Sequence, residues 1–311
     1  MASPPNSGSQ EYGQPQDQAQ QQPAGPAPTC FRHPGRQTYV SCVRCGRPAC
    51  PDCLRPAAVG HQCVECIKQG NQGARGAVGM FGGRAQSGAR VTYAIMAINV
   101  VLYLVLLARP SLANDWAMLG GARDPSNGQL VGVAFGQWYR VFTSAFLPPT
   151  GGLGLLDIAF NLWALWIVGP AVERVLGPVR FLGVYLASAV GGALSFYLLA
   201  PPNQGALGAS GAIFGLFGAW FVLAKRMGVD WRPVVTLIVL NLVIGFVGAS
   251  YIAWQDHIGG LVTGIVITAA YAYAPRKNRA VIQVAATIVV FALLALGIAL
   301  RDYNLVHQVI L

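Results

Sequence analysis

The stretch Pro201-Pro202-Asn203-Gln204-Gly205-Ala206-Leu207-Gly208-Ala209-Ser210-Gly211 separates two long apolar runs of this sequence. Its two prolines end the first run, because proline interrupts a helix. The small residues around Ser210 then open the second run, which continues to Met227. We therefore expect a hydrophobic helix over Leu207–Met227, with the hydroxyl of Ser210 uncovered near its start.

The whole sequence has the composition of a membrane protein. Of its 311 residues, 54% are hydrophobic and 10% are charged, whereas soluble proteins carry about 25% charged residues. Much of the formal net charge of +10 lies in short loops between apolar segments, where it sets topology. Residues 1–29 are rich in Pro, Gln, Gly and Ser, so we expect a disordered tail without a cleavable signal peptide.

Seven apolar segments are each close to the roughly 20 residues that cross a hydrocarbon core. They are Val91–Ala108, Leu155–Val172, Val179–Ala200, Leu207–Met227, Val234–Ala249, Trp254–Ala274 and Ala280–Leu300. We therefore predict an all-α polytopic membrane protein. Its first six helices form a core over residues 91–274, and residues 275–311 add a seventh transmembrane helix and an outer tail.

Basic residues are distributed unevenly between the two sides of the membrane. If the amino terminus is cytoplasmic, eight lie in the inner loops, namely Arg174, Arg180, Lys225, Arg226, Arg232, Arg276, Lys277 and Arg279. Four lie in the outer segments, namely Arg109, Arg123, Arg140 and Arg301. This excess satisfies the positive-inside rule. We predict a multi-pass cell-membrane protein with a cytoplasmic amino terminus and an extracytoplasmic carboxyl terminus.

This topology places Ser210 and His257 at similar depth, because their helices both run from outside to inside. Serine needs a base to take its proton before it can act as a nucleophile, and histidine is the usual base. Small residues allow two membrane helices to approach closely, and Phe214 can pack against the imidazole. The small residues are Gly208, Gly211, Gly215, Gly260 and Gly264. The alternative is that the glycines only pack helices and His257 faces water.

Asn161 interrupts the apolar run of the second helix. A buried amide is costly without a partner, and two donors, this side chain and the backbone N–H of Ser210, can stabilise an oxyanion. An interhelical hydrogen bond that serves only packing is the alternative interpretation of Asn161.

The seven cysteines all lie between Cys30 and Cys66. With one histidine they form four pairs of two-residue spacing, namely Cys30 and His33, Cys42 and Cys45, Cys50 and Cys53, and Cys63 and Cys66. Each such pair supplies two zinc ligands from one turn, so eight ligands predict a finger over residues 30–66 with two structural zinc ions. A disulfide module is the alternative, but the odd cysteine count and the paired histidine weigh against it. His61 is an additional ligand candidate.

The spacing of this finger resembles B-box-like and RING-like cross-brace fingers, and which pairs share a metal stays open. Residues 67–90 are predicted to be a flexible basic linker. The finger carries Arg32, Arg36, Arg44, Arg47 and Arg55. They are not interleaved with aromatic residues that would stack on bases, so a cytoplasmic protein partner is favoured over nucleic acid.

Taken together, these motifs resemble the rhomboid family of intramembrane serine proteases. The matching residues are Gly208-Ala209-Ser210-Gly211, His257-x2-Gly260-x3-Gly264, Trp138-Tyr139-Arg140, Phe160-Asn161 and Glu173-x3-Gly177-x2-Arg180-Phe181. The resemblance covers the six-helix core, and the seventh helix is similar to six-plus-one variants. The finger is similar to an appended domain of some actinobacterial relatives, which implies a bacterial source.

The resemblance implies cleavage of transmembrane protein substrates in the lipid bilayer, near the extracytoplasmic face. Ser210 would be the nucleophile, His257 the general base and acid, and Asn161 part of the oxyanion hole, with no cofactor for catalysis. Supporting roles fall to Gly208, Gly211, Phe214, Gly260, Gly264, Trp138 and Arg140. Asp256 adjoins His257, but a helix turns it elsewhere, so an orienting role is not expected.

One residue departs from the family pattern. The family commonly has histidine four residues before the second-helix asparagine, and this sequence has Asp157 there. An ionised carboxylate would repel an oxyanion, so we expect a slow protease. The alternative is a rhomboid-like pseudoprotease that binds membrane proteins without cleaving them. A transporter is disfavoured, because the rare charges form no path through the membrane and no inverted repeat is visible.

Overall fold

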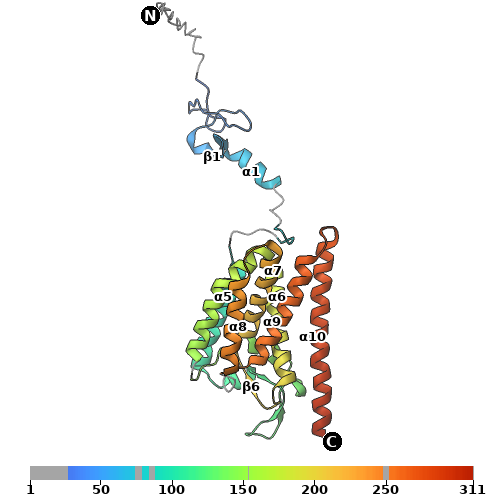
Figure 1. Ribbon diagram of the computed structural model, residues 1–311. Helices are drawn as coiled ribbons and strands as arrows, with labels where there is room; N and C mark the ends of the chain where they lie inside the picture. Colours follow the sequence, from blue (N-terminus) through green and yellow to red (C-terminus); the bar gives the residue numbers. More distant parts are fainter. Residues whose placement is uncertain (1–26, 74–78, 84–87, 153, 248–251, 311) are drawn as a thin grey trace, which may run out of the picture. The chain divides into compact units, whose positions relative to one another are not determined.

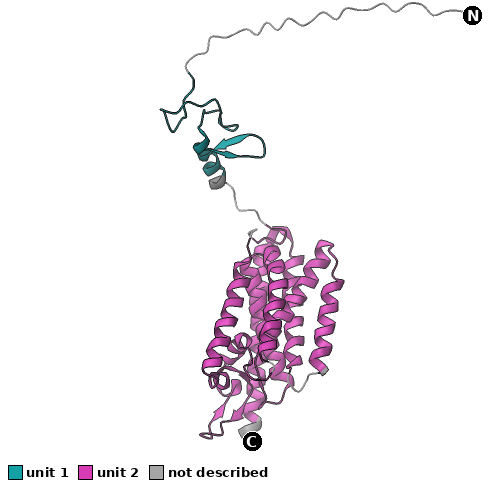
Figure 2. Cartoon of the chain, turned by 90° about the vertical axis from the view of Figure 1, so that its left-hand side faces the viewer, with its two compact units in different colours: residues 1–75 teal, residues 76–311 magenta. Residues whose placement is uncertain are grey.

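The computed structural model describes residues 27–73, 79–83, 88–152, 154–247 and 252–310. The chain divides into two compact units, Met1–Arg75 and Gly76–Leu311, which are coloured separately in Figure 2. The smaller unit contains the predicted finger, and the larger unit contains the predicted membrane helices.

The finger is a small element built around its cysteines. A 3-10 turn, η1 (Pro51–Cys53), leads into the antiparallel strands β1 (Leu54–Pro56) and β2 (His61–Cys63), and helix α1 (Val64–Gly73) follows. Its buried cluster contains six cysteines but only two other apolar residues, Ala49 and Leu54. The finger was predicted to end at residue 66 with a flexible linker after it, but α1 continues to Gly73, so that boundary is wrong.

The predicted all-α membrane fold is confirmed, because each of the seven predicted spans corresponds to a helix of the larger unit. These helices are α2 (Arg90–Ala108), α5 (Gly154–Leu176), α6 (Pro178–Leu199), α7 (Ser210–Met227), α8 (Arg232–Val247), α9 (Trp254–Tyr273) and α10 (Arg279–Ile310). In Figure 1 they run alongside one another, and α10 flanks the bundle at one edge. By length and composition, four described helical stretches can cross a membrane, namely Arg90–Ala108, Gly154–Leu176, Pro178–Leu199 and Arg276–His307.

Two helix boundaries differ from the prediction. Helix α7 begins at Ser210 rather than Leu207, because Gly208, with φ = +146°, does not have helical geometry. Helix α10 was expected to end near Leu300 and to be followed by an outer tail, but it continues to Ile310. The short 3-10 turn η4 (Arg276–Asn278) directly precedes it. The burial of Leu305, with 6% of its surface exposed, explains why the helix is extended.

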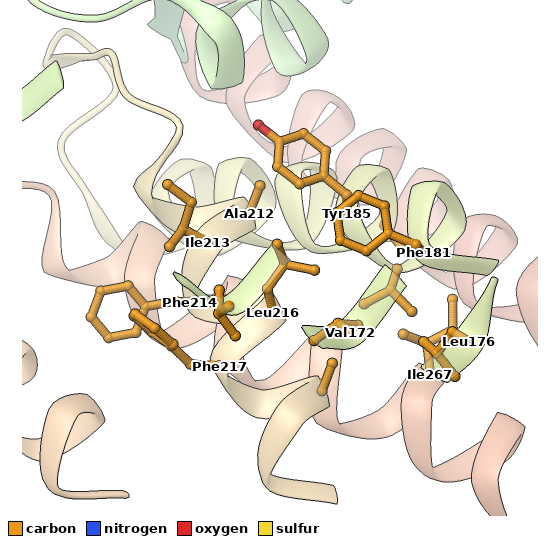
Figure 3. Close-up of a cluster of buried hydrophobic side chains, with 14 of the residues drawn as sticks. Val172, Leu176, Phe181, Tyr185, Ala212, Ile213, Phe214, Leu216, Phe217 and Ile267 are labelled. Carbon is orange, nitrogen blue, oxygen red and sulfur yellow. The ribbon is translucent and has the colours of Figure 1, made fainter. Parts of the chain in front are cut away.

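The hydrophobic core lies where α5, α6, α7 and α9 meet. Figure 3 shows side chains from all four helices in one cluster, including Leu176, Tyr185, Leu216 and Ile267. Helix α7 is central, since every residue from Gly211 to Ala219 is buried. The helices that carry Ser210 and His257 are therefore covered by neighbouring helices over much of their length.

The segment between α2 and α5 folds into short elements at the end of the bundle. They are α3 (Leu112–Trp116), β3 (Met118–Leu119), β4 (Ala122–Arg123), β5 (Leu130–Val131), η2 (Val133–Phe135), α4 (Arg140–Thr143) and η3 (Ser144–Phe146). Strand β4 pairs with β5, and β3 pairs with β6 (Gly205–Ala206). The second pairing fixes this segment beside the chain that leads into α7.

Part of the predicted flexible linker is packed into the membrane unit. Phe81 is 2% exposed and belongs to the main core cluster. The Gln283 amide of α10 donates to the carbonyl of Phe81 at 3.0 Å, and Arg279 donates to the carbonyl of Met80 at 2.7 Å. The prediction of a flexible linker over 67–90 is therefore wrong for the turn at Gly79–Gly83, because α10 supplies the donors that this backbone needs.

Candidate active site

Ser210 is the first residue of α7, and the turn before it depends on a glycine. Gly208 has φ = +146°, which residues with a side chain rarely adopt. The Gly208 N–H donates to the carbonyl of Ser144 at 3.1 Å, so the segment between α2 and α5 holds this turn in place. Ala209 precedes the helix and provides no side-chain cap. Ser210 itself is half-buried and begins α7 next to the segment between α2 and α5.

His257 lies in the first turn of α9 and is 7% exposed. Its ring stacks on Phe214 of α7, with 4.2 Å between the centroids and 12° between the planes. On another side the imidazole faces Gly245 of α8, where a Cβ would be in ordinary contact with Nδ1 at 3.5 Å. Phe214 therefore packs face to face against the histidine ring, one helical turn after Ser210.

The two helices meet through a seam of glycines. A Cβ at Gly260 would overlap the carbonyl of Gly211, and a Cβ at Gly264 would overlap the carbonyl of Gly215. The later residue of α9 contacts the later residue of α7, so the two helices run parallel. Their first residues therefore lie at the same end of the bundle. Ser210 precedes Gly211 by one residue and His257 precedes Gly260 by three, so their heights differ by roughly 3 Å at 1.5 Å per residue.

The structure therefore brings Ser210 and His257 together at one end of a tight helix pair. No hydrogen bond joins their side chains within the described part of the chain. Catalytic hydrogen bonds are often long in proteases without substrate and tighten when it binds. A hydroxyl and an imidazole in this arrangement can perform nucleophilic acyl transfer.

Asn161, on α5, lines a small cavity beside the start of α7. Asn99, Ala209 and Ile213 line the same cavity. The Asn161 amide donates from Nδ2 to Oδ2 of Asp157 at 2.9 Å, one turn earlier on α5. One of its two N–H groups is therefore engaged by the residue that departs from the family pattern, which the sequence alone did not indicate.

Arg140 and Trp138 have different surroundings in the segment between α2 and α5. Arg140 is 3% exposed and donates to the carbonyls of Asn114 and Ala117 at 2.7 and 2.9 Å and to the Gln137 side chain at 2.7 Å. These bonds tie α3 and the chain after it to α4. Trp138 is 61% exposed, which suits an interfacial position. Neither residue contacts Ser210 or His257 among the described contacts.

Glu173 organises the other end of the bundle. Its carboxylate accepts from the backbone N–H groups of Val91 and Thr92 at 3.0 and 2.8 Å and from the Thr92 hydroxyl at 2.7 Å. These groups begin α2, whose own preceding residue provides no side-chain cap. A carboxylate also interacts favourably with the positive end of a helix dipole, so this residue joins α5 to α2.

Asp256 is a polar residue beside His257, and the helix turns it away from the imidazole as predicted. Its carboxylate is directed away from the imidazole of His257 and packs on two glycines of neighbouring helices, Gly192 of α6 and Gly211 of α7. The available signal was an acidic residue beside His257 in an apolar helix, but the sequence did not show which helices it faces.

The finger holds two groups of four metal-ligating residues. One consists of Cys30, His33, Cys50 and Cys53, and the other of Cys42, Cys45, Cys63 and Cys66. Within each group the ligand atoms lie within 4.8 Å of one another. Alternate pairs are therefore combined, which is the cross-brace pattern. His61 belongs to neither group.

The donor set of the second group fits a tetrahedral zinc ion. Zinc–sulfur bonds of about 2.3 Å put two sulfur ligands roughly 3.8 Å apart, and Cys45 and Cys63 have their Sγ atoms 3.8 Å apart. The Cys63 N–H donates to the Sγ of Cys42 at 3.2 Å, and this donor lowers the pKa of the Cys42 thiol to about 6. A thiolate is the form that binds metal.

Comparison with known proteins gives consistent matches over the membrane unit. The model of the Rhomboid domain matches residues 135–274. The chain is 34% identical over 189 residues to rhomboid protease GluP of Bacillus subtilis, covering 58% of this chain but only 34% of that protein. It is 31% identical over 179 residues to the putative rhomboid protease YdcA of the same species, covering 56% of this chain and 84% of YdcA. Rhomboid protease GlpG of Yersinia pestis is 28% identical over 191 residues, 59% of this chain and 63% of GlpG.

Proposed function

Because this chain belongs to the rhomboid family of intramembrane serine proteases, we propose that it cleaves transmembrane proteins through a dyad of Ser210 and His257. The observation that carries the proposal is the parallel glycine seam between α7 and α9. It supports a hydroxyl and an imidazole at the same end of the bundle, and Asn161 lines a cavity together with Ala209, the residue before Ser210.

In the proposed reaction the Ser210 oxygen attacks the scissile carbonyl while His257 takes the hydroxyl proton. The oxyanion that forms accepts hydrogen bonds from the Ser210 backbone N–H and the Asn161 amide. His257 then gives its proton to the leaving amine, which departs and leaves an acyl-enzyme. Water attacks the acyl group with His257 again acting as base, and Ser210 is released with its proton.

The proposal also includes the orientation of the chain. The excess of basic residues on one side predicts a cytoplasmic amino terminus, which puts Ser210 and His257 near the extracytoplasmic face and the carboxyl terminus outside. Cleavage would then occur near the extracytoplasmic end of a substrate helix, where water can reach the acyl-enzyme. Cysteine accessibility at an introduced residue in the 228–231 loop tests this, since that loop should react only with a membrane-permeant thiol reagent in whole cells.

Cleavage of a model transmembrane substrate in proteoliposomes tests the catalytic assignment. Purified parent protein should produce one new fragment, and Ser210→Ala and His257→Ala should each abolish it. Leu156→Ala serves as a control, because Leu156 is 53% exposed on α5 and lies outside the site. If Ser210→Ala cuts as well as the parent, the dyad assignment is wrong.

A pseudoprotease is the second candidate, and the hydrogen bond from Asn161 to Asp157 is the observation that favours it. This bond engages a donor that the oxyanion would otherwise use. In that case the parent would bind transmembrane helices in pull-down experiments, and neither the parent nor Ser210→Ala would cleave them.

We also propose that the finger binds two structural zinc ions, one in each four-residue group, as a module for a cytoplasmic protein partner. The support is the complete ligand count and the cross-brace grouping. In the proposed state the thiolates and His33 hold the metal, and zinc supplies folding free energy that so small a core lacks. Metal analysis of the purified chain should give two zinc ions per chain; one would remove the two-ion proposal.

A further inference from the structure

Asp256 joins the backbones that carry the two candidate reacting residues. It immediately precedes His257 on α9, and its carboxylate lies against Gly211, which immediately follows Ser210 on α7. A Cβ added at Gly211 or at Gly192 of α6 would overlap this carboxylate. The acidic side chain therefore occupies a space that exists only because two facing positions have no side chain.

The start of α7 needs an acceptor that its own sequence does not supply. The first N–H groups of a helix have no partner within the helix, and they are usually capped by a Ser, Thr, Asp or Asn side chain just before it. Here that residue is Ala209, which provides no such bond. The Asp256 carboxylate packs against Gly211, the second residue of α7, and offers acceptor oxygens there.

We propose that Asp256 is a positioning residue, which packs from α9 against the start of α7 and so sets Ser210 against His257. The inference rests on the proposed function, because it concerns the reach between these two side chains. The role requires an acceptor side chain of fixed length beside Gly211. An asparagine can still accept through its Oδ1, whereas an alanine cannot, and a glutamate is one methylene too long for the space between Gly192 and Gly211.

The direction of the carboxylate separates this role from that of a third catalytic residue. A triad acid accepts a hydrogen bond from the histidine ring. In the described part of the chain no such bond joins Asp256 to His257, and the carboxylate faces the backbones of α6 and α7 instead. Asp256 is therefore expected to act through the placement of Ser210 and not through the protonation of the imidazole.

The test is steady-state cleavage of a model transmembrane substrate in proteoliposomes by the full chain. Asp256→Ala should lower kcat by roughly 10²-fold, because small misplacement of reacting groups has effects of that order, and should leave KM within about twofold of the parent value. Asp256→Asn should recover most of kcat, and Asp256→Glu should lose it despite its charge. Gln255→Ala, one residue earlier on α9, is the matched control and should behave as the parent does.

Reaction of Ser210 with a fluorophosphonate probe gives a second measurement, and the probe should label Asp256→Ala more slowly by a similar factor. If Asp256→Ala keeps the parent kcat, or if Asp256→Asn is as slow as Asp256→Ala, the positioning role is overturned. If Asp256→Ala does not fold, as judged by thermal unfolding, the comparison of Asp256→Asn with Asp256→Glu decides in the same way. A parent that neither cleaves nor reacts with the probe would instead overturn the proposed function.

Discussion

The hydrogen bond between Asn161 and Asp157 predicts that the oxyanion donor is only partly available. One N–H of the Asn161 amide is held by the Asp157 carboxylate at 2.9 Å. An oxyanion donor is worth about 10²–10³ in kcat, or about 2.7–4 kcal/mol. Because Asp157 competes for this donor, we expect Asn161→Ala to cost the parent at most about tenfold in kcat, which is about 1.4 kcal/mol.

Removing the carboxylate should release the donor. In the Asp157→Ala background, Asn161→Ala should cost the full amount of about 10²–10³. The two substitutions are therefore coupled by at least about 1.4 kcal/mol in a double-mutant cycle. Asp157→Ala alone should raise kcat, and Asp157→His should raise it further if the imidazole adds a donor.

The assay is the initial rate of substrate cleavage in proteoliposomes at saturating substrate, with Ser210→Ala as the background rate. Leu156→Ala, on an exposed face of the same turn of α5, controls for changes in helix packing. If Asn161→Ala slows the parent and the Asp157→Ala variant by the same factor, the competition does not exist. An Asp157→His variant that is no faster than the parent would contradict the donor argument as well.

Three further predictions concern packing and metal. Gly260→Ala should lower the free energy of unfolding by about 1–3 kcal/mol or more, because its Cβ would overlap α7. Thermal unfolding in detergent measures this. Gly151→Ala is the control and should match the parent, because Gly151 has open space around it. Phe81→Ala should lower the free energy of unfolding by about 3–5 kcal/mol in the same measurement. Met80→Ala is the control, because Met80 is 57% exposed. An equal effect from both substitutions would show that burial of Phe81 is not the cause. Removal of zinc with a chelator should make residues 30–66 sensitive to protease while the membrane unit keeps its unfolding temperature, since cysteines form most of the finger's buried cluster; a finger that stays resistant would contradict a structural metal.

Hydropathy and glycine spacing predicted much of the membrane unit. The long apolar runs specify helices because each has to satisfy its backbone internally in lipid. The G-x-x-x-G pair at Gly260 and Gly264 indicated a close helix partner, and the structure shows α7 as that partner. The paired cysteine spacing likewise indicated two ligand groups, although only the folded chain shows which pairs combine.

Other features depend on contacts between distant segments. Phe81 lies in a Gly- and Arg-rich stretch typical of a linker, yet its side chain joins the core cluster and its carbonyl accepts a hydrogen bond from Gln283, about 200 residues later. Ser210 begins α7 after a turn at Gly208, and the Ser144 carbonyl accepts a hydrogen bond from the N–H of that glycine. Asp256 has a polar side chain whose neighbours, Gly192 and Gly211, belong to two other helices. Local sequence patterns contain no information on such pairings.

The distribution of sulfur has a consequence for oxidative stress. All seven cysteines belong to the finger, so residues 76–311 contain no thiol. An oxidant that converts the finger thiols to disulfides removes metal ligands there, but it finds no cysteine to modify beside Ser210 or His257. Any sensitivity of proteolysis to thiol oxidants must therefore originate in the finger and be transmitted along the chain, and a variant lacking residues 1–75 should be insensitive to them.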